Sequence, residues 1–211
     1  GISSETGMIK RGIPQGSVLG PILFCLYIND LPLSISDQNV TSKLFADDTS
    51  LNANSEDLST VEKSLQSGVN DVSTWCRNNN MIIHPKKTKS MIITSRQKHQ
   101  IRPLILNLNV DNCSIHQVKQ HRVLGVIIDE DLKWEAHIDA IIKKLARNLY
   151  LLKQLRPYIN TDARKMFFQA HCLTHINYAS TVWDGAAENH QHKLNMIYKR
   201  AAKLILPDVT L

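Results

Sequence analysis

The stretch Phe45-Ala46-Asp47-Asp48 sets two adjacent carboxylates between apolar and β-favouring residues. Leu44 and Phe45 precede the acids and Thr49 to Leu51 follow them, which predicts two short strands with the acids at their junction. Neighbouring side chains of a strand point to opposite faces. Asp47 and Asp48 can therefore share a metal region only if the backbone turns between them. Carboxylates at such a turn suit Mg²⁺, whereas an isolated Asp-Asp pair is more often a solvated turn.

Before this stretch, the loop Gly12-Ile13-Pro14-Gln15-Gly16-Ser17 leads into a mostly apolar run that extends to Leu31. Gly20-Pro21 interrupts the run, and proline is tolerated in the first turn of a helix, so we expect the helix from about Pro21 onward. Gly16 and Ser17 lack bulk where the loop enters this helix. A nucleotide could therefore approach the backbone closely, although a turn-forming glycine has the same sequence.

After the acids, the pattern predicts a helix and then a hairpin. Ser55 is the expected N-cap, and apolar residues recur at helical spacing until the run 78–80 of asparagines. The short apolar runs 81–83 and 91–94 flank a basic turn that contains Pro85 and Lys87, which is typical of a hairpin.

Further hairpin signals run from Leu104 to Leu132, and purely helical spacing begins after Trp134. One long amphipathic helix should end at Arg156-Pro157, because the residue before a proline readily leaves helical geometry. Two more helices are expected near 162–183 and 192–206. The fold class is therefore predicted to be α+β over 1–134, followed by a three-helix region over 135–211.

Composition and charge favour a globular protein with a polyanionic partner. The 211 residues are 43% hydrophobic and 21% charged, with a net charge of +6. From 135 to 206 there are 11 Lys+Arg against 5 Asp+Glu, so the rest of the chain is balanced. The positive excess is confined to the helical third, where the alternative is an ordinary solvated helix face.

The location expected from the sequence is intracellular and away from membranes. The four cysteines have no paired spacing, so we predict reduced and mostly buried thiols. No apolar run approaches the roughly 18 residues that span a bilayer, and no signal peptide is evident. His171, Cys172 and His175 are the one metal-like cluster, which we interpret as helix packing because a fourth ligand is missing. Residue 1 is Gly, and the chain is expected to be part of a longer polypeptide.

The ordered motifs resemble a known family. The segments 12–21, 28–31 (Ile-Asn-Asp-Leu) and 45–48 are similar to the reverse transcriptases of non-LTR retrotransposons, particularly the jockey-like group. The similarity continues through Lys87-Thr88-Lys89, Leu124-Gly125-Val126, Leu132 and 134–138 in the family's order. It implies the C-terminal part of a right-hand polymerase: an antiparallel palm with helices from the Pro-Gln-Gly loop onward over 1–134, then a helical thumb over 135–211, with the fingers absent.

The resemblance implies an RNA-directed DNA polymerase, a magnesium-dependent nucleotidyltransferase. Asp47 would be a direct metal ligand, and Asp48 its less essential neighbour. Gln15 and Gly16 would lie beside the template and the incoming nucleotide. Phe45 matches an aromatic position near the primer end, although it could equally be a core residue.

Lys87 is the candidate general acid for the departing pyrophosphate, with a solvated basic turn as the alternative. The family usually has Asn three residues before this lysine, where this chain has His84. Leu124 and Gly125 match the hairpin that grips the primer backbone, although the bare sequence there reads as a buried strand. Candidate contacts to the nucleic-acid backbone lie in the helical third: Lys143, Lys144, Arg147, Lys153, Arg156, Arg164, Lys165, Lys199, Arg200 and Lys203.

The resemblance also implies what this chain lacks. The family's first metal-binding Asp comes from a strand before the Pro-Gln-Gly loop, and Glu5 does not match its position. We therefore expect no polymerisation by residues 1–211 alone. The expected partners are an RNA template, a DNA primer, deoxynucleoside triphosphates and the remainder of the polymerase, in the nucleus. The alternative function is a catalytically dead nucleic-acid-binding remnant; a group II intron maturase fits less well, because Tyr normally precedes its Ala-Asp-Asp.

Overall fold

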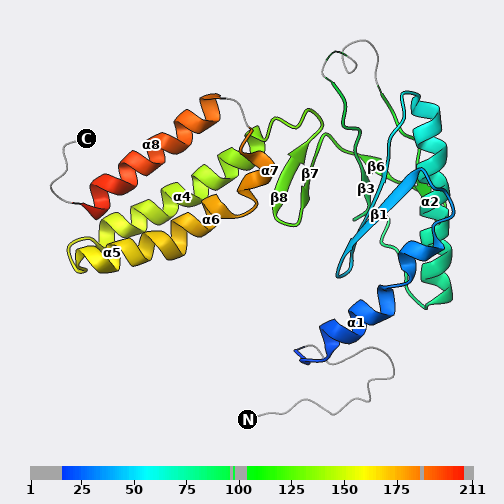
Figure 1. Ribbon diagram of the computed structural model, residues 1–211, viewed down its shortest axis with the longest axis horizontal. Coiled ribbons are helices and arrows are strands. Elements are labelled where there is room, and N and C mark those ends of the chain that lie inside the picture. Colours follow the sequence, from blue (N-terminus) through cyan, green and yellow to red (C-terminus); the bar gives the residue numbers. More distant parts are fainter. Residues whose placement is uncertain (1–15, 96, 98–103, 186–187, 207–211) are drawn as a thin grey trace. The chain divides into compact units, whose positions relative to one another are not determined.

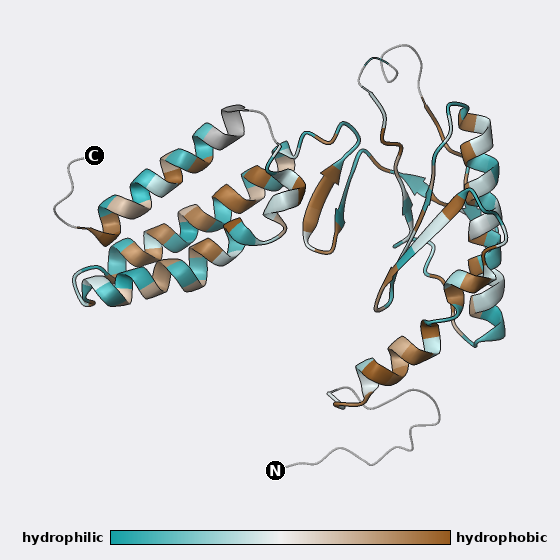
Figure 2. Ribbon diagram, viewed as in Figure 1, coloured by the Kyte–Doolittle hydropathy of each residue, from teal (hydrophilic) through white to brown (hydrophobic). Residues whose placement is uncertain are grey.

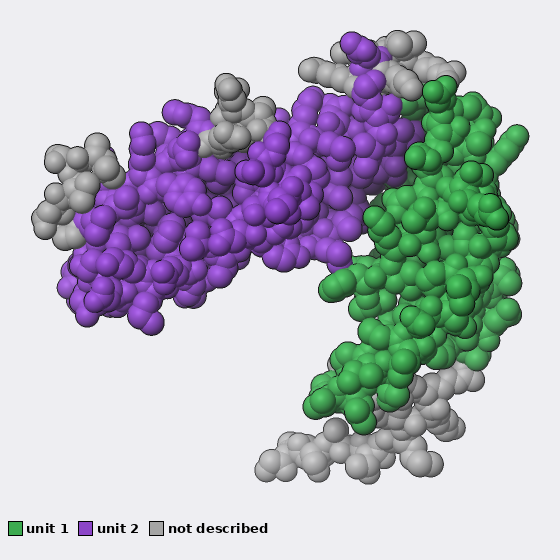
Figure 3. All heavy atoms as spheres, in the orientation of Figure 1, with its two compact units in different colours: residues 1–90, 104–117 green, residues 91–103, 118–211 purple. Residues whose placement is uncertain are grey.

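The computed structural model describes residues 16–95, 97, 104–185 and 188–206. The chain divides into two compact units (Figure 3). Unit 1 comprises Gly1–Ser90 with Leu104–Gln117, and unit 2 comprises Met91–Pro103 with Val118–Leu211. The architecture is α+β, as the sequence predicts, and the described strands form four separate pairs rather than one sheet.

Unit 1 begins with α1 and continues through a hairpin to a long helix (Figure 1). Proline in the first turn of α1 agrees with the expected late start of this helix. The elements in chain order are α1 (Gly20–Ile28), the 3₁₀ helix η1 (Leu31–Ser34), β1 (Val40–Phe45), β2 (Asp48–Ala53), α2 (Leu58–Asn78), β3 (Lys89–Ser90), β4 (Asn109–Val110), β5 (Cys113–Ser114) and β6 (His116–Gln117).

The N-cap of helix α2 lies two residues later than the predicted Ser55. Asp57 is the N-cap, and its carboxylate accepts hydrogen bonds from the backbone N–H groups of Ser59 (3.3 Å) and Thr60 (3.0 Å). The prediction of Ser55 as the cap was wrong, because a carboxylate satisfies two of the free amides at once. Hydrogen bonds from the Ser59 and Thr60 side chains and amides lower the pKa of Asp57 to about 2.

The core of unit 1 lies where α2 meets the end of α1 and η1. It contains Ile28, Leu31, Val72, Trp75 and Cys76. Nearer the start of α2, a Cβ added at Gly68 would lie 3.1 Å from Val40 Cγ1, so the missing side chain lets the β1–β2 hairpin approach the helix.

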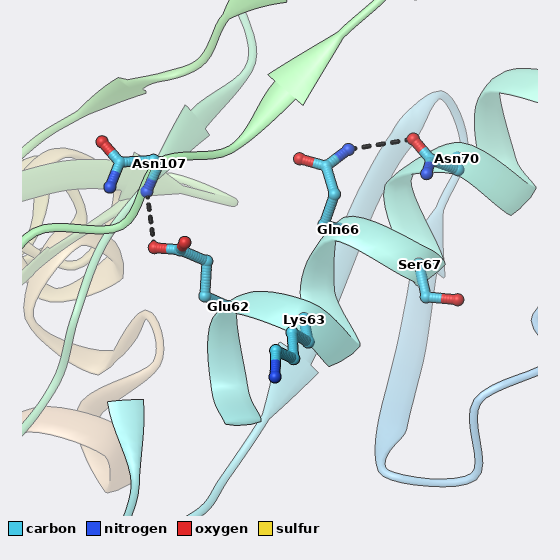
Figure 4. Close-up of a pocket in the computed structure, with 6 residues that line it drawn as sticks. All are labelled: Glu62, Lys63, Gln66, Ser67, Asn70 and Asn107. Carbon is cyan, nitrogen blue, oxygen red and sulfur yellow. Dashed lines mark hydrogen bonds between the residues drawn. The ribbon is translucent and has the colours of Figure 1, made fainter. Parts of the chain in front are cut away.

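Polar side chains attach the segment 104–117 to α2. The Gln66 side chain accepts from the Asn109 N–H (2.8 Å) and donates to the Asn109 carbonyl (2.9 Å), as a neighbouring strand would. Glu62 accepts from the Asn107 N–H at 2.8 Å (Figure 4). The shallow hollow of about 380 Å³ in Figure 4 is lined by α2 side chains and Asn107. Glu62 and Gln66 in its lining hold the segment 104–117 against α2, so we assign them a structural role.

The hairpin predicted around Pro85 was wrong. Residues 81–84 and 91–95 form no strand, and β3 pairs instead in parallel with β6, which joins Lys89 to His116 and Ser90 to Gln117. Local sequence favoured pairing across the nearby turn. The structure pairs this segment with one that follows nearly thirty residues later.

Unit 2 consists of a hairpin and a helical bundle. Its elements are β7 (Gln120–Val123), β8 (Val126–Asp129), α4 (Glu135–Leu155), α5 (Thr161–Phe168), the π-helix η2 (Gln169–Leu173), α6 (Thr174–Asn177), α7 (Ser180–Trp183) and α8 (Glu188–Ile205). Helices α4, α5 and α8 pack along one another, with apolar stripes on each (Figures 1 and 2). Ile138, Ile141, Leu145, Leu149 and Leu152 of α4 form the centre of the core.

The helix expected over 162–183 is broken. Residues 169–173 adopt the wider π geometry, and the chain then leaves helical geometry at Tyr178 (ψ 118°) and Ala179 (φ +50°). A single long helix was therefore the wrong prediction, since apolar spacing cannot reveal a break that tertiary contacts stabilise.

The change from strands to helices at Trp134 agrees with the sequence, because α4 starts at Glu135. The compact units divide earlier, at residue 118, so the β7–β8 hairpin packs with the helices. The assignment of 1–134 to the palm and 135–211 to the thumb stays a prediction.

All four cysteines are free, but only Cys76 and Cys172 are buried, so the expectation of mostly buried thiols holds for half of them. Among the helices that the structure describes, none has the length and apolar character that crossing a bilayer requires.

Candidate active site

The two acids lie at the connection between β1 and β2. The last pair of the antiparallel register is Phe45 with Asp48, so Ala46 and Asp47 alone form the turn. Ala46 has a φ of +51°, the left-handed geometry that two-residue hairpin turns require and that a residue with a Cβ adopts at a cost. The backbone therefore reverses direction at the acids, as is required if Asp47 and Asp48 are to share a metal region.

Both carboxylates are exposed. In the part of the chain that the structure describes, neither carboxylate takes part in a hydrogen bond or an ion pair, so the carboxylate oxygens are free to bind a metal ion. No third metal-ligating side chain joins them among the described residues. The arrangement offers two hard ligands on one turn.

The residues assigned to the nucleotide and template lie before these acids. Phe45 is 64% exposed, so it lies outside the core of unit 1. Gly16 has a φ of +85° and open space where a Cβ would be, so the loop presents bare backbone at this point. Gln15 lies outside the described residues.

Lys87 is exposed in a turn that the His84 carbonyl organises. This oxygen accepts from the N–H groups of Lys87 (3.0 Å) and Thr88 (3.1 Å) and from the Thr88 hydroxyl (3.2 Å). Main chain forms the turn, so the histidine in place of the family's asparagine leaves it intact. No hydrogen bond or ion pair joins Lys87 to Asp47 or Asp48 within the described part of unit 1.

Leu124 and Gly125 form the turn between β7 and β8, since Val123 pairs with Val126. Their φ values are +46° and +85°. The alternative of a buried strand is wrong at these two residues, which are both exposed.

The basic residues of the helices divide into two groups. Seven are exposed, on α4 and on α8: Lys143, Lys144, Arg147, Lys153, Lys199, Arg200 and Lys203. Arg164 instead donates to the Arg156 carbonyl (2.9 Å) and the Ile159 carbonyl (3.1 Å), so it closes the end of α4. Lys165 pairs with Asp162 at 3.6 Å, a weak exposed ion pair.

The cluster of His171, Cys172 and His175 forms no metal site among the described residues. Cys172 is fully buried in the core of unit 2, and this burial raises the pKa of its thiol to about 11, which disfavours the thiolate that zinc requires. His171 packs against Phe167, with ring centroids 4.6 Å apart.

Three residues of unit 2 were not identified from sequence. The Asp129 carboxylate accepts from the N–H groups of Asp131, Lys133 and Trp134 at 2.8 to 3.1 Å, which shapes the entry to α4. His137 is buried, and its Nδ1 accepts from the Ile127 N–H at 3.3 Å. Tyr178 donates to the Leu124 carbonyl at 2.6 Å. Local signals existed for Asp129, in the acidic turn at 129–131, and for His137, within the segment 134–138 that resembles the family. The contact of Tyr178 left none, because it joins residues 54 apart.

Comparison with known proteins agrees with the resemblance. The family described as "Reverse transcriptase (RNA-dependent DNA polymerase)" matches residues 2–128. Relatives from Drosophila melanogaster include the probable RNA-directed DNA polymerases from transposon BS (24% identical over 94% of this chain) and from transposon X-element (26% over 97%). The RNA-directed DNA polymerase from mobile element jockey is 23% identical over 97%.

The chain spans less than a quarter of the length of these three relatives, 22 to 23%. No solved structure matches it. Because the family match covers more than half of the chain, and because the relatives named are polymerases of mobile elements, the chain belongs to the reverse transcriptases, of the kind that jockey-like non-LTR retrotransposons carry.

Proposed function

We propose that this chain is the palm, from the Pro-Gln-Gly loop onward, and the thumb of an RNA-directed DNA polymerase that extends a DNA primer on an RNA template. The observation that carries the proposal is the exposed acidic turn at Asp47 and Asp48, inside the segment 2–128 that matches the family. The polymerase would act in the nucleus, where a mobile element reaches its target DNA.

The acidic turn fits part of a magnesium site. Mg²⁺ prefers oxygen ligands in an octahedral shell, and the Asp47 and Asp48 carboxylates have no competing partner among the described residues. When bound, a pair of divalent ions supplies charge neutralisation at the attacking and leaving oxygens of nucleotidyl transfer. Two carboxylates supply too few oxygen ligands to hold two divalent ions. We therefore propose that an acidic residue from the remainder of the polymerase completes the site.

The other residues of unit 1 would position substrate around this turn. Gly16 offers an approachable backbone, and with Gln15 it would contact the template and the incoming deoxynucleoside triphosphate. The exposed ring of Phe45 would pack at the primer end. The Lys87 ammonium would give a proton to the departing pyrophosphate.

Unit 2 would hold the duplex. The turn at Leu124 and Gly125 would contact the primer backbone, and the seven exposed basic residues of α4 and α8 would bind phosphates. Contacts of this kind release counterions, so the affinity should fall steeply as salt rises.

The remainder of the polymerase would cover α1. Figure 2 shows that α1 is largely apolar, and Ile22 and Leu26 of this helix are 56% and 69% exposed. Leu23 of the same helix and Val18 and Leu19 just before it are also exposed. A helix that is apolar on all sides is normally buried. We therefore propose that the fingers and the upstream palm pack on α1, and that residues 1–211 alone do not polymerise.

Metal binding by the turn can be measured without activity. Mn²⁺ added to the 211-residue protein should broaden the amide resonances of residues 46–48, because a bound paramagnetic ion relaxes nearby nuclei. Asp47→Ala should abolish this broadening and Asp48→Ala should weaken it, whereas Glu56→Ala, at another exposed acid, should change nothing. Equal broadening in Asp47→Ala would contradict the metal assignment.

Primer extension tests the reaction. A longer polypeptide that adds the fingers and upstream palm should synthesise DNA with Mg²⁺, and Asp47→Ala should lower that rate by roughly 10³-fold or more. Synthesis by residues 1–211 alone would overturn the proposed inactivity of the chain. Salt-sensitive duplex binding by an intact longer polypeptide that cannot extend a primer would instead support the nucleic-acid-binding remnant.

A further inference from the structure

The turn between β7 and β8 has a demanding geometry. Leu124 and Gly125 both have positive φ, as in the two-residue turns that match the twist of a hairpin. Gly125 adopts this region freely, but Leu124 does so against the repulsion between its Cβ and the backbone. A turn with leucine at this position therefore benefits from an external support.

Tyr178 supplies that support. Its hydroxyl donates to the Leu124 carbonyl oxygen at 2.6 Å. A Cβ placed on Gly125 would lie 3.4 Å from Tyr178 Cε1, so the ring lies directly against this glycine. One side chain thus contacts both residues of the turn.

Tyr178 is itself held in place by the break between α6 and α7. Its N–H donates to the Thr174 carbonyl at 3.1 Å, and its carbonyl accepts from Trp183 Nε1 at 3.2 Å. The left-handed Ala179 then turns the chain away from the helix. The interruption of the helix is what directs the phenol toward the hairpin.

The hairpin has a second attachment through the same tryptophan. His137 accepts from the Ile127 N–H of β8, and its ring lies edge-on to Trp183 with centroids 5.9 Å apart. Trp183 is buried and contacts both His137 and Tyr178. The hairpin is therefore bound to the helices at its tip and at its middle.

We propose that Tyr178 is a positioning residue that fixes the Leu124–Gly125 turn so that its two amide N–H groups can bind phosphate oxygens of the primer backbone. Neither amide has an acceptor among the described residues of unit 2, and backbone N–H groups are common phosphate donors. The proposal rests on the primer-binding function given above. The Tyr178 hydrogen bond is solvent-exposed, so its contribution to overall stability should be small.

Tyr178→Phe in the free 211-residue protein tests the structural link without nucleic acid. The amide resonances of Leu124 and Gly125 should shift, while the melting temperature changes by less than about 2 °C. Tyr158→Phe is the matched control, because Tyr158 is 85% exposed and its hydroxyl has no hydrogen-bond partner among the described residues. Unchanged turn resonances in Tyr178→Phe would overturn the positioning role whatever the protein binds.

Binding to a DNA primer annealed to an RNA template tests the functional step. Tyr178→Phe should raise the Kd about three- to tenfold at every salt concentration, with an unchanged slope of log K against log salt, because amide donors release no counterions. Gly125→Ala, which adds a Cβ against the ring, should raise the Kd by at least as much. Lys143→Ala should reduce the slope instead, and Tyr158→Phe should leave both quantities unchanged.

The outcomes separate the two proposals. A wild-type protein that does not bind the primer–template would overturn the primer-binding function and the phosphate contact together, while the resonance shifts could still demonstrate the link from Tyr178 to the turn. Wild-type binding with an unaltered Kd in Tyr178→Phe would overturn this inference alone. A large fall in melting temperature with the weaker binding would assign Tyr178 a merely structural role.

Discussion

Two of the three hairpin turns that the structure describes, those of β1–β2 and β7–β8, differ in how they are held. Each consists of two residues, and each places a residue other than glycine in the left-handed region, Ala46 in one and Leu124 in the other. The turn at Ala46 carries two exposed carboxylates and receives no side-chain hydrogen bond among the described residues. The turn at Leu124 carries no charge and is held by Tyr178 and, through β8, by His137.

The difference follows from what each turn would offer a ligand. Carboxylates bind through side chains, which adjust to an ion, and the ion itself can order the turn. Backbone amides move only with the backbone, so a turn that binds through them must be rigid before the ligand arrives. The acidic turn would be ordered by its ligand, and the uncharged turn is ordered by the protein.

Leu145→Ala should produce the largest contrast between the two turns. Leu145 is fully buried at the centre of unit 2, and such truncations cost about 2–5 kcal/mol of unfolding free energy. Chemical denaturation should report this loss. Hydrogen exchange should show faster opening of the Ile127 amide, which depends on the helices through His137.

The β1–β2 amides should keep their protection in this variant, because they belong to unit 1. Leu151→Ala, on the same helix but 48% exposed, is the control and should change little. An equal loss of protection in both hairpins would mean that the two turns do not depend on separate cores.

The hairpin of unit 2 should weaken in mild acid. Burial lowers the pKa of His137 below its ordinary value, and the charges of Arg122 and Lys144 lower it further. Because the folded pKa lies below the unfolded one, the stabilisation is complete above about pH 6.5 and is lost as the pH falls through the folded pKa. The loss amounts to about 1.4 kcal/mol for each unit of depression.

Denaturation of the wild type from about pH 7.5 to about pH 5 should reveal this loss in unit 2. His137→Gln keeps an acceptor for the Ile127 N–H without titrating, and should flatten the profile. His121→Gln, at an exposed histidine, should leave the profile unchanged. A pH dependence that persists in His137→Gln would assign the effect to another group.

The smallest effect is expected from glycine in the two turns. Ala46→Gly and Leu124→Gly both relieve left-handed strain and both add freedom to the unfolded chain, so each should change the unfolding free energy by less than about 1 kcal/mol. Backbone relaxation should distinguish them. Residues 46–47 should become more mobile in Ala46→Gly, whereas Tyr178 should keep residues 124–125 ordered in Leu124→Gly. Equal loosening of both turns would contradict the support assigned to Tyr178.

Much of the fold and part of the candidate site could be predicted from sequence. The acidic turn, the long amphipathic helices and the end of α4 before Pro157 were all predicted, because each depends on residues within one or two turns of chain. The features that were missed depend on contacts between residues far apart in the sequence. The β3–β6 pair, the break at Tyr178 and the Gln66 contact with Asn109 each need a partner from far along the chain or a contact in the folded core.

The sequence by itself determined the family, the order of the motifs and the adjacency of Asp47 and Asp48, since these are properties of neighbouring residues. The tertiary structure alone decided which turn is supported. Tyr178 and Leu124 are 54 residues apart, and the bond between them exists only because a helix break, a buried tryptophan and a hairpin meet in unit 2. No local pattern encodes that contact, because its free energy comes from packing between elements that are distant in the chain.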